Sequence, residues 1–115
     1  MAIYVKNKDL LEEIIRCQDA SIGPSDELIK MWQKMAERFS YKFTYINPDD
    51  RQDCMAQGVM DCYLYWHNFN TKKGTNAFAY FTQLIKNGFA KMWRKLHPLS
   101  SADFIRFSVY NIWSI

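Results

Sequence analysis

The stretch that most constrains this chain is Asp53–Lys95, which is predicted to form a helix, a basic turn and a second helix. Apolar residues such as Phe81, Ile85 and Phe89 recur at helical spacing and mark the buried side of the second helix. No Asp or Glu occurs within Asn76–Lys95, although lysines and aromatic residues are interleaved there. Cations and aromatic rings without acids are typical of a surface that binds a polyanion and stacks on its bases.

The composition indicates one globular domain with more aromatic residues than a small core needs. The chain has 115 residues, of which 49% are hydrophobic and 17% aromatic, so it can bury a single core. Residues 1–53 have eight Lys/Arg against ten Asp/Glu, a net charge of −2, whereas residues 54–115 have seven against two, a net charge of +5. This asymmetry suggests two partner surfaces of different chemistry.

The cysteines and histidines show no catalytic or metal-binding pattern. Cys17, Cys54 and Cys62 have no disulfide-framework spacing, which favours a reducing cytoplasm. His67 and His97 have no cysteine at metal-ligand spacing. No apolar run has the length of a membrane span or the form of a signal peptide. We therefore expect a cytoplasmic protein that is not an enzyme and has no metal site, no cofactor and no membrane partner.

Capping residues and helical periodicity predict an all-α fold of four to five helices. Ser25, Asn47 and Asn76 each precede an apolar-periodic segment, as helix caps do. Tyr41–Ile46 is expected to be an extended connector rather than a strand, because no nearby segment offers a pairing partner. The expected helices, with Asn7 as the cap of the first, are Asn7–Ala20, Ser25–Phe39, Asn47–His67 and Asn76–Lys95.

The boundaries of the domain follow from the same pattern. Residues 1–98 are expected to form the compact helical unit, which ends at His97-Pro98 because proline cannot continue a helix. Residues 99–115 are apolar but match neither the helical nor the strand period, so they are a fifth helix or a docking tail. In the third helix, Met55, Val59, Cys62 and Trp66 are expected to face the core, and Gly58 is expected to permit a close contact.

The basic residues of the second half allow two interpretations. A solvated lysine face is the usual explanation of such a run. Acids are missing from the same face, so the cations are expected to be unpaired, and the interleaved rings favour nucleic-acid binding. The residues themselves leave both interpretations open.

Motifs in a fixed order resemble region 2 of bacterial sigma factors. The family patterns D-L-x-Q-E-G and K-F-D/E-x-x-R/K-G-x-x-F-S-T-Y-A correspond here to DCMAQG, NFNTKKG and NAFAYFT. The sequence is similar still more closely to the small late-transcription sigma factors of T-even-type bacteriophages, through YVKNKDLLEEII, HNF and NAFAYFTQ. The order and spacing of these motifs are more specific than any one of them, and they cover most of the first 95 residues.

The resemblance implies a sigma region 2-like helical domain that binds RNA polymerase core in a bacterial host cell. In that family the third helix docks on the clamp coiled coil of the largest core subunit. The fourth helix contacts promoter DNA, mainly the non-template strand, and melts a TATA-rich element. The core-binding residues would be Asp53, Gln57, Gly58, Met60 and Tyr63. The DNA-binding residues would be Lys72, Lys73, Tyr80, Lys86, Asn87, Lys91, Arg94 and Lys95.

Departures from the family pattern lower the expected ability to melt promoter DNA. Gln83 and Leu84 replace two tryptophans, and Ala77 and Ala79 replace an aromatic residue and a threonine. Each lost stacking platform costs about 1–3 kcal/mol per base, so initiation at phage late promoters is expected to need a coactivator, with a sliding clamp as a further possible partner. The alternatives are a sigma-like regulator that occupies core polymerase without melting DNA, and a generic helical nucleic-acid-binding domain.

Overall fold

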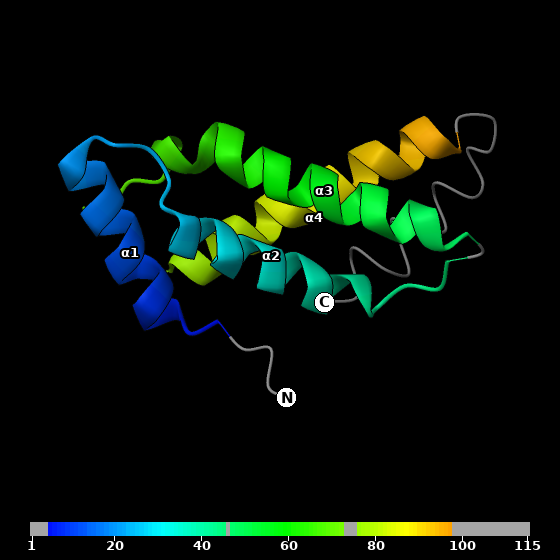
Figure 1. Ribbon diagram of the computed structural model, residues 1–115, viewed down its shortest axis with the longest axis horizontal. Helices are drawn as coiled ribbons and strands as arrows, with labels where there is room; N and C mark the ends of the chain where they lie inside the picture. The colour runs from blue at the N-terminus through cyan, green and yellow to red at the C-terminus, as the bar shows by residue number, and fades with distance from the viewer. Residues whose placement is uncertain (1–4, 46, 73–75, 98–115) are drawn as a thin grey trace.

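Three of the described α-helices begin at a side chain that accepts a free backbone N–H group of the first turn. A computed structural model describes residues 5–45, 47–72 and 76–97 (Figure 1). Ser25 accepts from Leu28 N, Asn47 from Asp49 N and Asn76 from Ala79 N, at 2.9–3.1 Å, which confirms the three expected caps. The helices are α1 (Asn7–Ala20), α2 (Asp26–Ser40), α3 (Pro48–Tyr65), the 3-10 turn η1 (Trp66–Asn68) and α4 (Ala77–Leu96).

Asn7 has a different role from the one expected. The N-cap of α1 is Lys6, and no side chain caps that helix. Asn7 Oδ1 instead accepts a hydrogen bond of 2.9 Å from the backbone N–H of Phe78, in the first turn of α4. The prediction that Asn7 caps its own helix is therefore wrong. Asn7 and Asn76 together accept two of the free backbone N–H groups in the first turn of α4. Asn7 also links the first helix to α4.

The described part of the chain is all-α, as expected, with four α-helices and no strand. α3 and α4 run antiparallel and make the largest interface, α2 lies along α3, and α1 lies across one end of the other helices (Figure 1). Residues 41–45 form turns and a connector rather than a strand. The proposed fifth helix or docking tail at residues 99–115 lies outside the described residues.

α3 and α4 meet backbone to backbone at two glycines. A Cβ atom added to Gly88 would lie 2.7 Å from Gly58 Cα and 2.9 Å from the carbonyl oxygen of Gln57. A Cβ added to Gly58 would instead meet side chains, with Ile85 Cγ2 and Phe89 Cε1 at 3.3 Å. The two helices can approach this closely only because Gly88 carries no side chain, whereas a Cβ at Gly58 would press on side chains that can shift.

The inner face of α3 differs from the one predicted. Buried residues of α3 recur at i, i+4, i+7 and i+8, and they are Cys54, Gly58, Asp61 and Cys62. Met55 and Val59, which were expected to face the core, are only partly buried. The prediction was right for Cys62 and Trp66, but the helix is rotated relative to the expected stripe. The close approach of α4 selects the small residues for the inside and leaves Met55 and Val59 at the edge of the core, on the side that faces α2.

Aromatic rings from α4 fill the space between the helices. The centroid of the Phe81 ring lies 5.4 Å from the ring centroid of Trp32 in α2. The Phe89 ring lies 4.9 Å from that of Phe39, edge to face, which is a favourable aromatic geometry. The buried apolar core comprises Leu10, Ile14, Cys17, Leu28, Trp32, Met35, Ala36, Phe39, Phe43, Cys54, Cys62, Trp66, Phe69, Ala77, Phe81, Ile85 and Phe89.

Glu13 joins α1 to the beginning of α2. Its carboxylate accepts hydrogen bonds from Arg16 and from the Ser25 hydroxyl, which itself caps α2. The Arg16 bond, followed by the Ser25 bond, lowers the pKa of Glu13 from 4.5 to about 2. The Glu13 carboxylate therefore favours the folded chain only while it is ionised.

We predict that Gly88→Ala destabilises the protein more than Gly58→Ala. Either alanine gains about 1 kcal/mol of helix propensity. At Gly88 the new methyl group meets backbone and forces the helices apart, so we expect a net loss of about 1–3 kcal/mol. At Gly58 the neighbours are side chains that can shift, so the net change should be below about 1 kcal/mol. Urea unfolding measures both, and equal stabilities would contradict the backbone contact.

We also predict that the contribution of Glu13 to stability depends on acid pH. Because the folded pKa lies below the ordinary value, the contribution is complete above pH 4.5 and is lost as the pH falls through about 2. Glu13→Gln should therefore lower the urea midpoint at neutral pH, and its difference from the wild type should narrow towards pH 2. A difference that is constant with pH would show that the charge of Glu13 plays no part. Glu12→Gln, an exposed neighbour, is the control.

Candidate protein-binding groove and nucleic-acid-binding face

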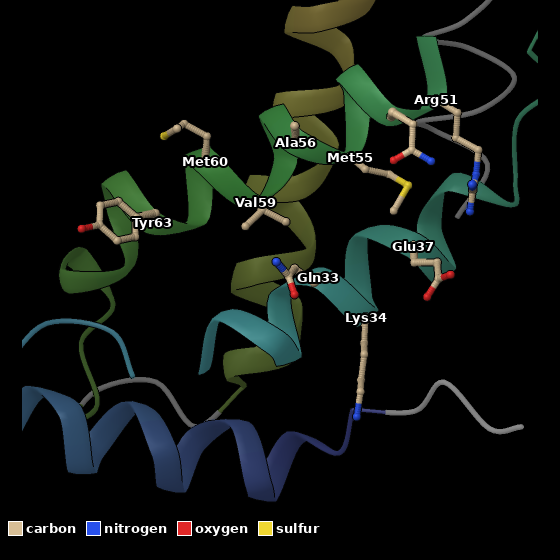
Figure 2. A pocket seen from close by; sticks show the side chains of 10 residues that line it. Gln33, Lys34, Glu37, Arg51, Met55, Ala56, Val59, Met60 and Tyr63 are labelled. Atoms are coloured by element: carbon tan, nitrogen blue, oxygen red, sulfur yellow. The ribbon is translucent and has the colours of Figure 1, made fainter. Parts of the chain in front are cut away.

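An open groove runs between α2 and α3 (Figure 2). It has a volume of about 810 Å³, and α3 contributes a stripe at helical spacing that includes Met55, Val59 and Tyr63. α2 contributes polar and charged side chains from the facing side. The lining residues are Gln33, Lys34, Glu37, Arg51, Gln52, Met55, Ala56, Val59, Met60 and Tyr63.

The chemistry of this groove suits a helix of another protein. Met60 and Tyr63 are 50% and 51% exposed and line the same groove as Met55 and Val59, so they belong to one apolar surface rather than to scattered exposed side chains. Methionine side chains adapt to the shape of a partner, and Lys34 and Glu37 offer both signs of charge along one edge. An apolar stripe with a charged rim is the pattern of grooves that hold amphipathic helices.

The five residues predicted to bind polymerase lie on different sides of α3. Met60 and Tyr63 line the groove. Asp53 is exposed but does not line it. Gln57 is partly buried and donates a hydrogen bond of 2.9 Å to Asp61. Gly58 is buried against α4, so its assignment to a partner-facing surface is wrong, and the close contact that it permits is within the fold.

Sequence reasoning missed most of the groove. Met55 and Val59 were assigned to the core, and no residue of α2 was considered. The spacing of the small residues Cys54, Gly58 and Cys62 could have identified the inner side of α3, because small residues at i, i+4 and i+8 permit close helix packing. With that face turned inward, Met55 and Val59 point toward α2, as Figure 2 shows.

The predicted DNA-binding residues of α4 have mostly exposed side chains. Asn87, Arg94 and Lys95 are exposed, and Lys86 is partly buried. The amide of Gln83 donates to Asn87 Oδ1 at 2.9 Å, so two amides lie together on the outer side of the helix. Lys72 is exposed in the turn before α4, and Lys73 lies outside the described residues.

Lys91 has an acidic partner, which corrects the expectation that the cations of α4 are unpaired. Its Nζ lies 3.1 Å from each carboxylate oxygen of Asp61. Asp61 is buried on the inner face of α3. The absence of acids from α4 itself therefore did not show that every cation of that helix is available.

Tyr80 is anchored in the fold rather than projecting freely from it. Its hydroxyl donates to the backbone oxygen of Tyr65 at 3.1 Å. Its ring packs against Phe69 and Phe81, with centroid distances of 5.1 and 5.0 Å. Burial raises the pKa of the Tyr80 phenol. Tyr80 is half-buried, so a base could reach only part of its ring.

The thiols of the described residues are explained by packing, and His97 is engaged within the fold. All three cysteines are free and buried, and burial raises the pKa of Cys54 to about 12 and raises that of Cys62 as well. A thiol held protonated in this way is a poor nucleophile. His97 lies 3.2 Å from Asp50 and stacks on Trp93. Within the described residues no three His, Cys, Asp or Glu side chains are grouped as metal ligands would be.

Comparisons with protein-family models, curated proteins and solved structures each found no match to this chain. Within the described residues, no helix combines the length and the apolar character that crossing a membrane requires.

We predict that Tyr80→Phe and Tyr80→Ala differ in stability. The phenylalanine keeps the ring contacts and loses one hydrogen bond, which costs about 1 kcal/mol. The alanine also loses the packing on Phe69 and Phe81, which should raise the cost to about 2–3 kcal/mol for a half-buried ring. Thermal unfolding followed by circular dichroism measures both. If Tyr80→Ala unfolds at the wild-type temperature, the ring does not support the fold.

Proposed function

We propose that this protein is a minimal sigma-type factor that binds RNA polymerase core and directs it to promoters with a TATA-rich element. The observation that supports this most is the division of the helical pair. The groove is lined by α2 and α3 alone. Lys72, Lys91, Arg94 and Lys95 are exposed on α4 and the turn before it, and α4 itself carries no Asp or Glu. A sigma factor needs two such surfaces, because it must hold a protein and a nucleic acid at the same time.

The groove is the proposed site for polymerase. The exposed side chains of Met60 and Tyr63 and the partly exposed Met55 and Val59 give it an apolar centre. The resemblance to sigma region 2 points to a helical coiled coil of the largest core subunit as the occupant. A helix laid between α2 and α3 would cover these side chains, which otherwise face water.

The outer side of α4 is the proposed site for DNA. Few cations are available there, so binding to DNA alone should be weak and should decrease steeply with salt. The most exposed aromatic ring among the described residues of α4 is Phe78, at the beginning of the helix. Exposed Gln83 and partly buried Leu84 offer no ring for a base to stack on. This supports a factor that opens promoters weakly and depends on a coactivator.

A second function, that of a regulator which occupies core polymerase without opening DNA, is favoured by two specific contacts. Tyr80 is held by Tyr65 and Phe69. Lys91 is held by Asp61. Tyr80 and Lys91 would each have to contact DNA while they keep these contacts within the fold. Run-off transcription with purified core on a TATA-rich late-type template separates the two functions, since the regulator binds core but yields no transcript.

We predict that Met60→Asp and Tyr63→Asp weaken binding to core polymerase by about tenfold or more, because each places a charge in an apolar contact. Ile22→Asp is the matched control, since Ile22 is 66% exposed and lies outside the groove. Affinity for core is measured by fluorescence anisotropy of the labelled full chain. Equal affinities for all three variants would show that the groove is not the docking site.

A further inference from the structure

Asp61 is a buried acid at the seam between α3 and α4. Its exposed fraction is 2%. Three hydrogen bonds satisfy its carboxylate: two of 3.1 Å from Lys91 Nζ and one of 2.9 Å from Gln57 Nε2. A carboxylate this deeply buried is stable in its charged form only with such partners.

Lys91 lies at the border between this seam and the proposed DNA-binding face. Its side chain is 49% exposed. Asn87, one turn before it, and Arg94, one turn after it, are both exposed. The ammonium group has three N–H donors, and contacts to the two oxygens of Asp61 direct it toward α3 rather than outward. A DNA phosphate on this face and the Asp61 carboxylate would therefore compete for the same cation.

We propose that Asp61 is an intramolecular competitor that withholds Lys91 from DNA and so weakens the hold of α4 on a promoter. This inference rests on the proposed function of α4. It assigns to Asp61 a role distinct from packing, because an uncharged residue of the same shape would fill the same space. Since Gln57 also holds Asp61, the restraint on Lys91 is built from two residues of the helix that forms the groove.

The test compares Asp61→Asn with the double variant Asp61→Asn/Lys91→Gln. Asparagine has nearly the shape of aspartate and can still accept from Gln57, but it does not hold the ammonium group by charge. Lys91→Gln alone is unsuitable, because it leaves the buried Asp61 charge unpaired. Binding of the full chain to a labelled, pre-opened TATA-rich duplex is measured by fluorescence anisotropy at KCl concentrations from about 50 to 300 mM, the range over which one phosphate contact changes affinity severalfold.

We predict that Asp61→Asn binds this DNA about five to ten times more tightly near 0.1 M salt, and that its log–log salt slope is steeper by about 0.7–0.9, as one added phosphate contact requires. The double variant should lose the gain. A gain that persists in the double variant would overturn the inference, because it would come from removing the acid and not from releasing Lys91.

Lys86→Gln separates this inference from the proposed function. If Lys86→Gln weakens binding while Asp61→Asn leaves it unchanged, α4 binds DNA but Asp61 does not restrain Lys91. If neither variant changes the affinity, both the DNA function of α4 and the inference fail.

A measurement on the wild type does not depend on the folding of any variant. Mild acylation followed by mass spectrometry should modify Lys91 more slowly than Lys95 in the native chain and equally fast in urea. Equal native rates would overturn the restraint on Lys91.

Discussion

The contact between Gly58 and Gly88 is the constraint on which the rest of the structure depends. Because a Cβ at Gly88 would lie within 3 Å of three backbone atoms of α3, the two helices can pack at this distance only without a side chain at position 88. Their closeness requires small residues along the inner side of α3. The same closeness brings the aromatic residues of α4 against those of α2, where Phe89 meets Phe39.

This packing also determines what α3 presents outside. With Cys54, Gly58 and Cys62 turned toward α4, the larger apolar side chains of α3 must face α2 and the solvent. The groove is thus a consequence of the glycine contact and not a separate feature. Buried Asp61 is on the same inner side, and its carboxylate forms an ion pair with Lys91 of α4. The proposed protein-binding and DNA-binding surfaces are therefore two sides of one tightly packed helical pair.

The sequence predicted those parts of the fold that depend on local chemistry. Ser25, Asn47 and Asn76 cap the helices that follow them because the cap is formed within a few residues of chain. Asn7 had the same local signal, but its side chain reaches α4, and only the tertiary fold supplies that partner.

Predictions that depend on tertiary contacts were less successful. Periodicity placed Met55 and Val59 inside, because hydrophobicity alone does not say which side a neighbouring backbone will approach. Gly58 was correctly identified as a point of close contact, although the partner is α4 and not another protein. Lys91 was expected to be unpaired, since an ion pair between two helices leaves no local trace in the sequence. The exposed stripe of Met60 and Tyr63 remains a prediction for polymerase binding.

The central claim is that the two sides of the α3–α4 pair meet different molecules. It is tested most directly by photo-crosslinking, with a crosslinking residue at position 63 or position 87 of the full chain in a complex with core polymerase and TATA-rich promoter DNA. We expect position 63 to crosslink to the largest polymerase subunit and position 87 to crosslink to DNA. Crosslinks from both positions to the same molecule, or from position 63 to DNA, would contradict the account.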